Sequence, residues 1–299
     1  MQSLMYLIFA ALGFVIPFGI SLAIGNEQVQ NIVLLVYIIQ WVAFIPAYIF
    51  QTEKFFDLTG SITYSSVFIY CIYLTTSGDL NWGSLVISIL VILWAGRLGS
   101  FLFTRIAKDG EDKRFRTIKP DIAQFFMTWT LQGMWVSLCS LCAITGIASE
   151  TGIIVNNIFY IGLVMFIGGF AIEIVADQQK TAFRAIPENR NKYITSGLWS
   201  KSRHPNYFGE ITLWTGVAVM SFSSLSGIEY LTLISPIFTY LLLVKISGVR
   251  MLEGRGQKTW GNDEDYIAYM KNTPMAVSYT HLRAHETRHD LVCRLLLEK

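Results

Sequence analysis

The chain has 299 residues, of which 53% are hydrophobic and only 15% are charged, and its formal net charge is +2. A water-soluble domain of this length could not cover so much apolar surface, so the composition indicates an integral membrane protein. The small net charge excludes a partner held by a strongly basic surface, and we expect no nucleic acid to bind.

Mostly apolar stretches recur along the chain, and about 17 to 25 such residues cross a hydrocarbon core of ~30 Å. In chain order, the eight predicted spans are residues 4–24, 29–50, 62–76, 83–106, 122–147, 154–175, 208–224 and 230–249. The third and seventh are short, so seven crossings remain an alternative. Every span must be helical, because an open sheet edge finds no hydrogen-bond partner in lipid. We therefore predict an all-α, polytopic helix bundle.

The charges in the predicted loops alternate along the chain. The loops after the first, third, fifth and seventh spans carry acidic residues and no Lys or Arg. The basic residues of the other loops are Lys54, Lys108, Lys113, Arg114, Arg116, Lys119, Lys180, Arg184, Arg190, Lys192, Lys201 and Arg203. Because Lys and Arg near span ends favour the cytoplasmic side, both termini are predicted to be cytoplasmic.

One membrane domain is predicted over residues 1–275, and residues 276–299 form a tail of different composition. From Ser278 onward this tail resembles the translated read-through of a sequencing adapter, so we expect it to lie outside the fold. Its histidines, His281, His285 and His289, have a spacing that could present a zinc site on one helical face. We favour the artefact interpretation and expect no metal.

A polar block between the sixth and seventh spans concentrates charged, amide and aromatic side chains. Lys180 and Arg184 share a face if the sixth helix continues beyond the membrane, and two cations on one face suit a phosphate. Arg203 can make a bidentate contact with such a group. Trp199 and Tyr207 offer flat faces for a nucleobase. The alternative is that these residues are membrane anchors and interfacial aromatic residues with no ligand.

Three motifs of this block carry a resemblance to a known family. They are Lys-x-x-x-Arg at residues 180–184, Ser-Gly-Leu-Trp at 196–199, and Arg-His-Pro-Asn-Tyr-x-Gly-Glu at 203–210. The pattern resembles the steroid 5-alpha-reductase and sterol reductase superfamily, in particular its DUF1295 branch. The similarity extends over nearly all of residues 1–275.

The resemblance implies that NADPH binds at the cytoplasmic helix ends without a Rossmann fold, and the sequence has no Gly-x-Gly-x-x-Gly motif. Lys180, Arg184 and Arg203 would then contact phosphates. The other side chains assigned to the cofactor site are Trp199, His204, Asn206, Tyr207, Glu210 and Glu253. The implied reaction is reduction of a carbon–carbon double bond in a hydrophobic lipid or steroid-like molecule taken from the bilayer. The implied location is a bacterial inner membrane, or the endoplasmic reticulum in a eukaryote.

Such a reduction also needs a proton donor or a group that polarises a carbonyl. Candidates near the start of the third span are Glu53, Asp57 and Tyr64. Glu173 and Arg97 lie inside predicted spans, where an ionisable side chain indicates function.

Two other functions remain open at this point. An isoprenylcysteine-type methyltransferase uses S-adenosylmethionine with a similar Arg-His-Pro-x-Tyr-x-Gly stretch. The Lys180 and Arg184 pair favours the reductase, because S-adenosylmethionine has no phosphate. A non-catalytic protein that binds membrane lipid or acts as a scaffold is the third hypothesis.

Overall fold

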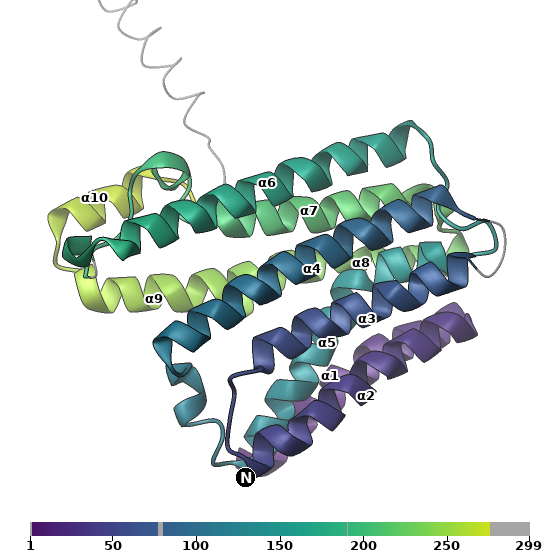
Figure 1. The fold of residues 1–299 in the computed structure, drawn as a ribbon, viewed down its shortest axis with the longest axis horizontal. Coiled ribbons are helices and arrows are strands. Elements are labelled where there is room, and N and C mark those ends of the chain that lie inside the picture. Colours follow the sequence, from purple (N-terminus) through teal and green to yellow (C-terminus); the bar gives the residue numbers. More distant parts are fainter. Residues whose placement is uncertain (1, 77–79, 190, 276–299) are drawn as a thin grey trace, which may run out of the picture. The chain divides into compact units, whose positions relative to one another are not determined.

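A computed structural model describes residues 2–76, 80–189 and 191–275. Within these ranges the regular elements are all helical (Figure 1). The α-helices are α1 (Gln2–Ile24), α2 (Glu27–Ile49), α3 (Phe56–Thr76), α4 (Trp82–Asp109), α5 (Ile122–Ile147), α6 (Asn157–Ala185), α7 (Pro205–Ser221), α8 (Ile234–Tyr240), α9 (Gly248–Trp260) and α10 (Glu264–Asn272). The tail at 276–299, with its three histidines, lies outside the described residues.

Seven helical segments in the described part of the chain are long and apolar enough to cross a membrane. The prediction of a polytopic, all-α membrane protein is confirmed. α7 has 17 residues and is not among these seven, so length and composition support the alternative count of seven. The last segment, Gly227–Trp260, joins α8 and α9 through a π-helical stretch at Leu241–Ile246. From hydropathy alone we had predicted one membrane-spanning helix at residues 230–249.

The chain divides into two compact units. The first comprises Met1–Phe166 and Trp214–Thr239, and the second comprises Ile167–Leu213 and Tyr240–Lys299, described as far as residue 275.

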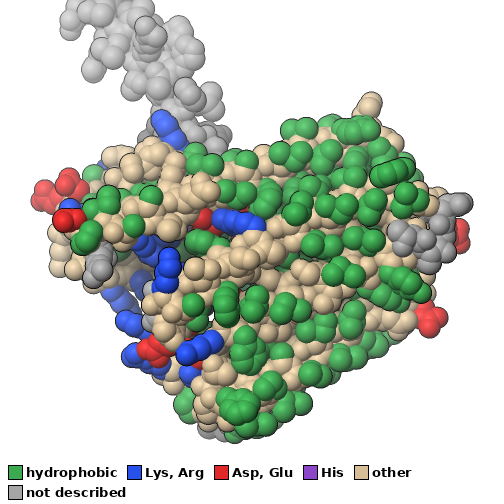
Figure 2. All heavy atoms as spheres, viewed as in Figure 1, with side chains coloured by type: hydrophobic (Ala, Val, Ile, Leu, Met, Phe, Trp, Pro, Cys, Tyr) green, Lys and Arg blue, Asp and Glu red, His purple; other side chains and the backbone are tan. Residues whose placement is uncertain are grey.

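α5 forms the centre of the first unit. α1 and α2 pack against α5, and α3 lies along α4 (Figure 1). α5 is the most completely buried of the long helices. The outer faces are apolar as well: Ile69 on α3 and Leu93 on α4 are both 58% exposed, and hydrophobic side chains cover these helices in Figure 2. A bundle that is apolar both inside and outside suits a lipid environment.

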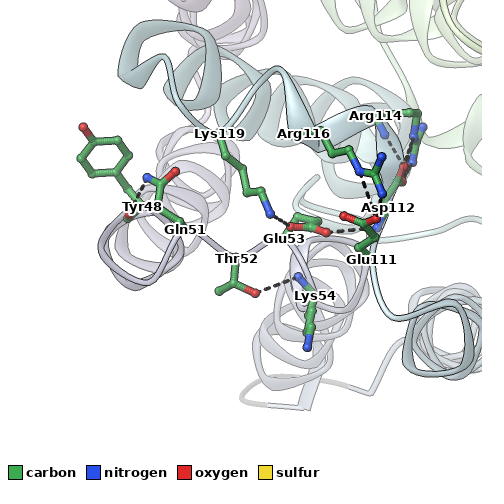
Figure 3. A network of polar contacts seen from close by, with 10 residues as sticks. All are labelled: Tyr48, Gln51, Thr52, Glu53, Lys54, Glu111, Asp112, Arg114, Arg116 and Lys119. Carbon is green, nitrogen blue, oxygen red and sulfur yellow. Dashed lines mark hydrogen bonds and ion pairs between the residues drawn. The ribbon is translucent and has the colours of Figure 1, made fainter.

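Side-chain contacts sort the loops of the first unit into two groups. Asn26 Nδ2 donates to the Ala148 carbonyl at 2.9 Å, and Asn81 Nδ2 donates to the Thr151 carbonyl at 3.0 Å. These bonds join three of the loops predicted to lack Lys and Arg. The two basic loops meet elsewhere, where Lys119 pairs with Glu53 (Figure 3). The grouping agrees with the predicted alternation, and the orientation in the membrane stays a prediction.

α6 and α7 approach each other through glycines. In the second unit, a Cβ atom on Gly169 would lie 2.5 Å from the Gly209 carbonyl oxygen, and the reverse distance is also 2.5 Å. In the first unit, Gly162 and Gly216 show the same reciprocal contact at 2.6 Å. Only residues without a Cβ allow backbones to come this close.

Two helix boundaries set up the polar block. α6 continues to Ala185, well beyond the predicted end at residue 175. Lys180 and Arg184 therefore lie one turn apart on the same helix. This meets the condition under which we predicted that they share a face, namely that the sixth helix continues beyond its apolar span. α7 begins at Pro205, because proline fixes a helical φ and has no N–H to leave unsatisfied.

Candidate functional site

A cleft with a volume of about 140 Å³ opens in the second unit. Its walls come from α6, from the segment between α6 and α7, and from α9 and α10. The residues that line it are Lys180, Phe183, Arg184, Lys192, Tyr193, Ile194, Trp199, Arg203, His204, Leu252, Glu253, Gly256, Trp260, Tyr266, Tyr269 and Met270.

Six of the nine side chains assigned to the cofactor by resemblance line this cleft: Lys180, Arg184, Trp199, Arg203, His204 and Glu253. The other three lie on the first turns of α7. Asn206 Nδ2 points to an Asp177 carboxylate oxygen at 3.4 Å, and the Tyr207 ring stacks on His204 with a centroid distance of 5.7 Å. Glu210 is buried. Contact of these three with a nucleotide stays a prediction.

Arg203 is held by protein groups on several sides. Its Nε donates to Glu253 Oε1 at 2.9 Å, and its Nη1 donates to the Met270 and Thr273 carbonyls at 2.6 and 3.0 Å. Those carbonyls belong to the C-terminal end of α10, where a helix leaves acceptors unsatisfied. Arg203 therefore fastens α10 and α9 to the start of α7. The predicted phosphate contact by Arg203 stays a prediction.

His204 contacts the same carboxylate oxygen. Its Nε2 lies 3.1 Å from Glu253 Oε1. Burial lowers the pKa of His204, although the hydrogen bond with Glu253 acts in the opposite direction. The ring is therefore neutral near pH 7, and the contact requires the tautomer in which Nε2 carries the proton and donates it.

Trp199 is buried, and its Nε1 donates to the Ala176 carbonyl at 3.1 Å. The Lys180 ammonium lies 4.7 Å from the centroid of the Trp199 ring. This cation–π contact uses the flat face that we had predicted for a nucleobase. Trp199 thus positions Lys180 at the cleft.

Besides Phe183, the sequence analysis missed four aromatic side chains of the cleft: Tyr193, Trp260, Tyr266 and Tyr269. Tyr193 is at the centre of this group, which we call the aromatic wall, with ring centroids 5.5 Å from Trp260, 4.9 Å from Tyr266 and 5.9 Å from Tyr269. Aromatic residues three apart in the polar segment after the last span, at positions 266 and 269, were a signal that could have revealed part of it.

The candidate catalytic residues lie in the first unit. Glu53 is 5% exposed, its carboxylate pairs with Lys119 Nζ at 2.5 Å, and it accepts the Asp112 backbone N–H at 3.0 Å (Figure 3). Asp57 lies 3.8 Å from an Arg105 nitrogen. None of the three candidates lines the cleft of the second unit.

Tyr64 is fully buried among the rings of three tryptophans, Trp94, Trp135 and Trp214, at centroid distances of 5.2, 5.5 and 5.4 Å. The roles of Tyr64, Asp57 and Glu53 stay predictions.

The fold and the cleft together define a polytopic helical membrane protein with a polar, aromatic cleft built at helix ends. The chain belongs to the family described as protein of unknown function (DUF1295), whose match covers residues 43–273. The family that the sequence motifs indicated is therefore confirmed.

Two curated relatives match parts of the chain. The steroid 5-alpha-reductase DET2 of Arabidopsis thaliana is 43% identical over 67 residues, which cover 22% of this chain and 25% of the relative. The probable O-methyltransferase ustE of Ustilaginoidea virens is 32% identical over 117 residues, covering 34% of this chain and 41% of the relative. The chain thus spans less than half the length of either relative, and no solved structure matches it. The first relative supports the superfamily link and a reductase-like family.

Proposed function

We propose that this protein is a membrane-embedded reductase that uses NADPH to reduce a carbon–carbon double bond in a hydrophobic, lipid or steroid-like molecule. The observation that carries the proposal is the charge of the cleft. Among the described residues that line it, four are Lys or Arg, namely Lys180, Arg184, Lys192 and Arg203, and one is acidic. That acid, Glu253, already accepts from Arg203 and His204.

This donor set fits a ligand with several phosphates, and NADPH is such a ligand. Lys180, Arg184 and Lys192 would hold its phosphates, with Arg203 and Glu253 keeping the walls in place. When bound, NADPH would supply a hydride to one carbon of the double bond and become NADP⁺, while the other carbon takes a proton. The substrate would come from the bilayer, because hydrophobic molecules partition there and the chain has membrane-spanning helices.

Nucleotide binding by the full chain in detergent tests the proposal. A ligand that binds only the folded state raises the melting temperature in a concentration-dependent way. We expect this shift with NADPH. Arg184→Gln should weaken the binding of NADPH about 10-fold or more, because the substitution removes a charge-assisted contact. Arg184 is exposed and lines the cleft, so the variant should fold normally.

Lys201→Gln is the matched control, since Lys201 is exposed and does not line the cleft. Equal loss of NADPH affinity in both variants would point to general electrostatics and count against the site. A comparison with NADH measures what the extra phosphate of NADPH contributes.

A methyltransferase that uses S-adenosylmethionine is the second candidate, favoured by the similarity to the probable O-methyltransferase. Its cofactor carries a cationic sulfonium and no phosphate, so a cleft rich in Lys and Arg suits it less well. A thermal shift with S-adenosylmethionine alone would replace the reductase proposal with this one. No shift with either cofactor would support the non-catalytic, lipid-binding or scaffold hypothesis.

A further inference from the structure

The cations of the cleft do not explain its aromatic wall. We infer that this wall, formed by Tyr193, Trp260, Tyr266 and Tyr269, is the subsite for the adenosine end of the nucleotide. The inference rests on the proposed function, in which NADPH occupies this cleft, and it deepens that function by assigning one end of the ligand to named side chains.

The wall offers flat surfaces to the cleft. Tyr266 is buried, whereas Tyr193, Trp260 and Tyr269 are partly exposed. Tyr193 meets Trp260 and Tyr266 edge-on, with interplanar angles of 63° and 71°. Tyr193 stacks on Tyr269 with an interplanar angle of 29°, whereas Trp260 meets Tyr193 edge-on and Tyr266 at a tilt of 46°. Neither contact of the partly exposed Trp260 ring covers its face, and an uncovered face can accept a planar base.

The wall is also fixed in place. Trp260 Nε1 donates to the Asn191 carbonyl at 2.8 Å, and the Tyr269 hydroxyl donates to the Trp199 carbonyl at 2.7 Å. Burial raises the pKa of Tyr269 to about 12, so this hydroxyl keeps its proton and the bond persists at neutral pH. Rings that are already ordered lose little conformational entropy when a ligand binds, which favours stacking.

Charge next to the wall favours the phosphorylated end of the ligand. Lys192 immediately precedes Tyr193, and Lys180 and Arg184 line the same cleft. A planar base attached to a ribose with phosphates therefore meets both features within one cleft. The cleft volume of about 140 Å³ is below the ~300 to 1,000 Å³ of pockets that enclose a whole drug-sized ligand. It has room for one end of a dinucleotide.

The position along the chain decides which end. Tyr193, Tyr266 and Tyr269 lie outside the candidate membrane spans, and Trp260 is the last residue of one. The hydride must reach a hydrophobic substrate that resides in the bilayer. The nicotinamide is therefore the end that must approach the apolar part of the protein, and the adenosine is the end that can remain among polar segments.

Fragments of the cofactor test this assignment. Adenosine 2′,5′-bisphosphate carries the adenosine end with its phosphates, and nicotinamide mononucleotide carries the other end. We expect the bisphosphate to raise the melting temperature of the full chain in detergent and nicotinamide mononucleotide to raise it less at equal concentration. Trp260→Leu should weaken the binding of the bisphosphate about 5- to 100-fold, which is the range found when an aromatic stacking partner of a base is removed.

Trp82→Leu is the matched control, because Trp82 is 67% exposed and belongs to the first unit. Tyr193→Leu is a second test should Trp260→Leu unfold, since Tyr193 is partly exposed, and Tyr193→Phe should retain binding.

The outcomes separate the two proposals. The adenosine assignment is wrong and the reductase proposal stands if NADPH binds but the bisphosphate does not. The same conclusion follows if Trp260→Leu and Tyr193→Leu both bind the bisphosphate as the wild type does. If the bisphosphate binds through the wall but NADPH reduces no lipid, the subsite stands and the reductase proposal fails. Binding of neither fragment nor NADPH overturns both.

Discussion

Each unit of the molecule contains a glutamate paired with a basic side chain, but the surroundings of the two pairs differ. In the first unit, Glu53 and Lys119 meet where two loops cross, and the side chains are 3% and 19% exposed. In the second unit, Glu253 and Arg203 both line the cleft, with side chains 27% and 17% exposed. The same chemical pair closes a loop junction in one place and lines an open cleft in the other.

The neighbours of each pair account for the difference. Glu53 also accepts the Asp112 N–H, and nearby Arg114 and Arg116 pair with Asp112 and Glu111 (Figure 3). Acidic partners thus neutralise much of the basic charge at this junction. The cleft around Glu253 is lined by more basic than acidic side chains, and several of its other side chains are aromatic. Counting Lys and Arg in a loop therefore does not distinguish a closed loop junction from the lining of a cleft; the ratio of basic to acidic side chains does.

The largest effect should come from breaking the pair in the first unit. Lys119→Ala leaves the Glu53 carboxylate buried without its cation, and we expect it to lower the free energy of unfolding by about 3 kcal/mol. Equilibrium unfolding in mixed detergent micelles measures this. Lys54→Ala, at an exposed neighbour, should change it by less than about 0.5 kcal/mol. Similar values for both variants would show that Lys119 is only a surface charge.

Breaking the pair in the second unit should cost somewhat less. Arg203→Ala removes the bonds to Glu253 and to the Met270 and Thr273 carbonyls, but Glu253 and Met270 are partly exposed and can be hydrated. We expect a loss of about 2 kcal/mol in the same unfolding measurement. Arg203→Lys should recover part of it, because lysine keeps the charge but not the planar fork.

Arg255→Ala is the control, since Arg255 is exposed on the same helix as Glu253. A loss in Arg203→Ala no greater than in this control would contradict the anchoring role that the geometry gives to Arg203.

The smallest effect concerns pH. Burial lowers the pKa of His204 in the folded state below its usual value of 6.5, and Lys180 and Arg203 act in the same direction. The unfolded chain then binds more protons than the folded one just below pH 6.5, so this histidine makes stability fall as pH falls. The loss should stay below about 1 kcal/mol between pH 7 and 5, because Glu253 opposes it.

The pH dependence of unfolding in wild type, compared with His204→Gln, isolates this contribution, since glutamine keeps a hydrogen-bonding group and does not titrate. The difference between the two curves should grow as pH falls. Parallel curves, or a wild type stabilised by acid relative to the variant, would mean that the folded protein does not disfavour the charged ring.

Much of the fold and part of the site followed from local sequence signals. Apolar runs predicted the helices, and the spacing of Lys180 and Arg184 predicted two cations on one helix face. Each of these depends on residues that are neighbours in the chain.

The contacts between distant segments that hold the cleft residues in place could not be predicted from such local signals. Arg203 is held largely by backbone carbonyls at Met270 and Thr273, which no side-chain pattern marks. Tyr193 meets Trp260 and Tyr266 only because the last segment folds back on the segment before α7. Contacts between distant segments depend on packing, and a single sequence carries no local trace of them.

The origin of the cleft walls also constrains how the protein is made. One wall comes from residues 180–204 and the other from residues 252–270. A ribosome that has delivered α7 to the membrane has produced only the first wall. Trp260 and Tyr269 must then emerge and bond to Asn191 and Trp199 before the cleft exists. During synthesis, the cleft is therefore completed only after Gly227–Trp260, the last candidate membrane span among the described residues, has been translated.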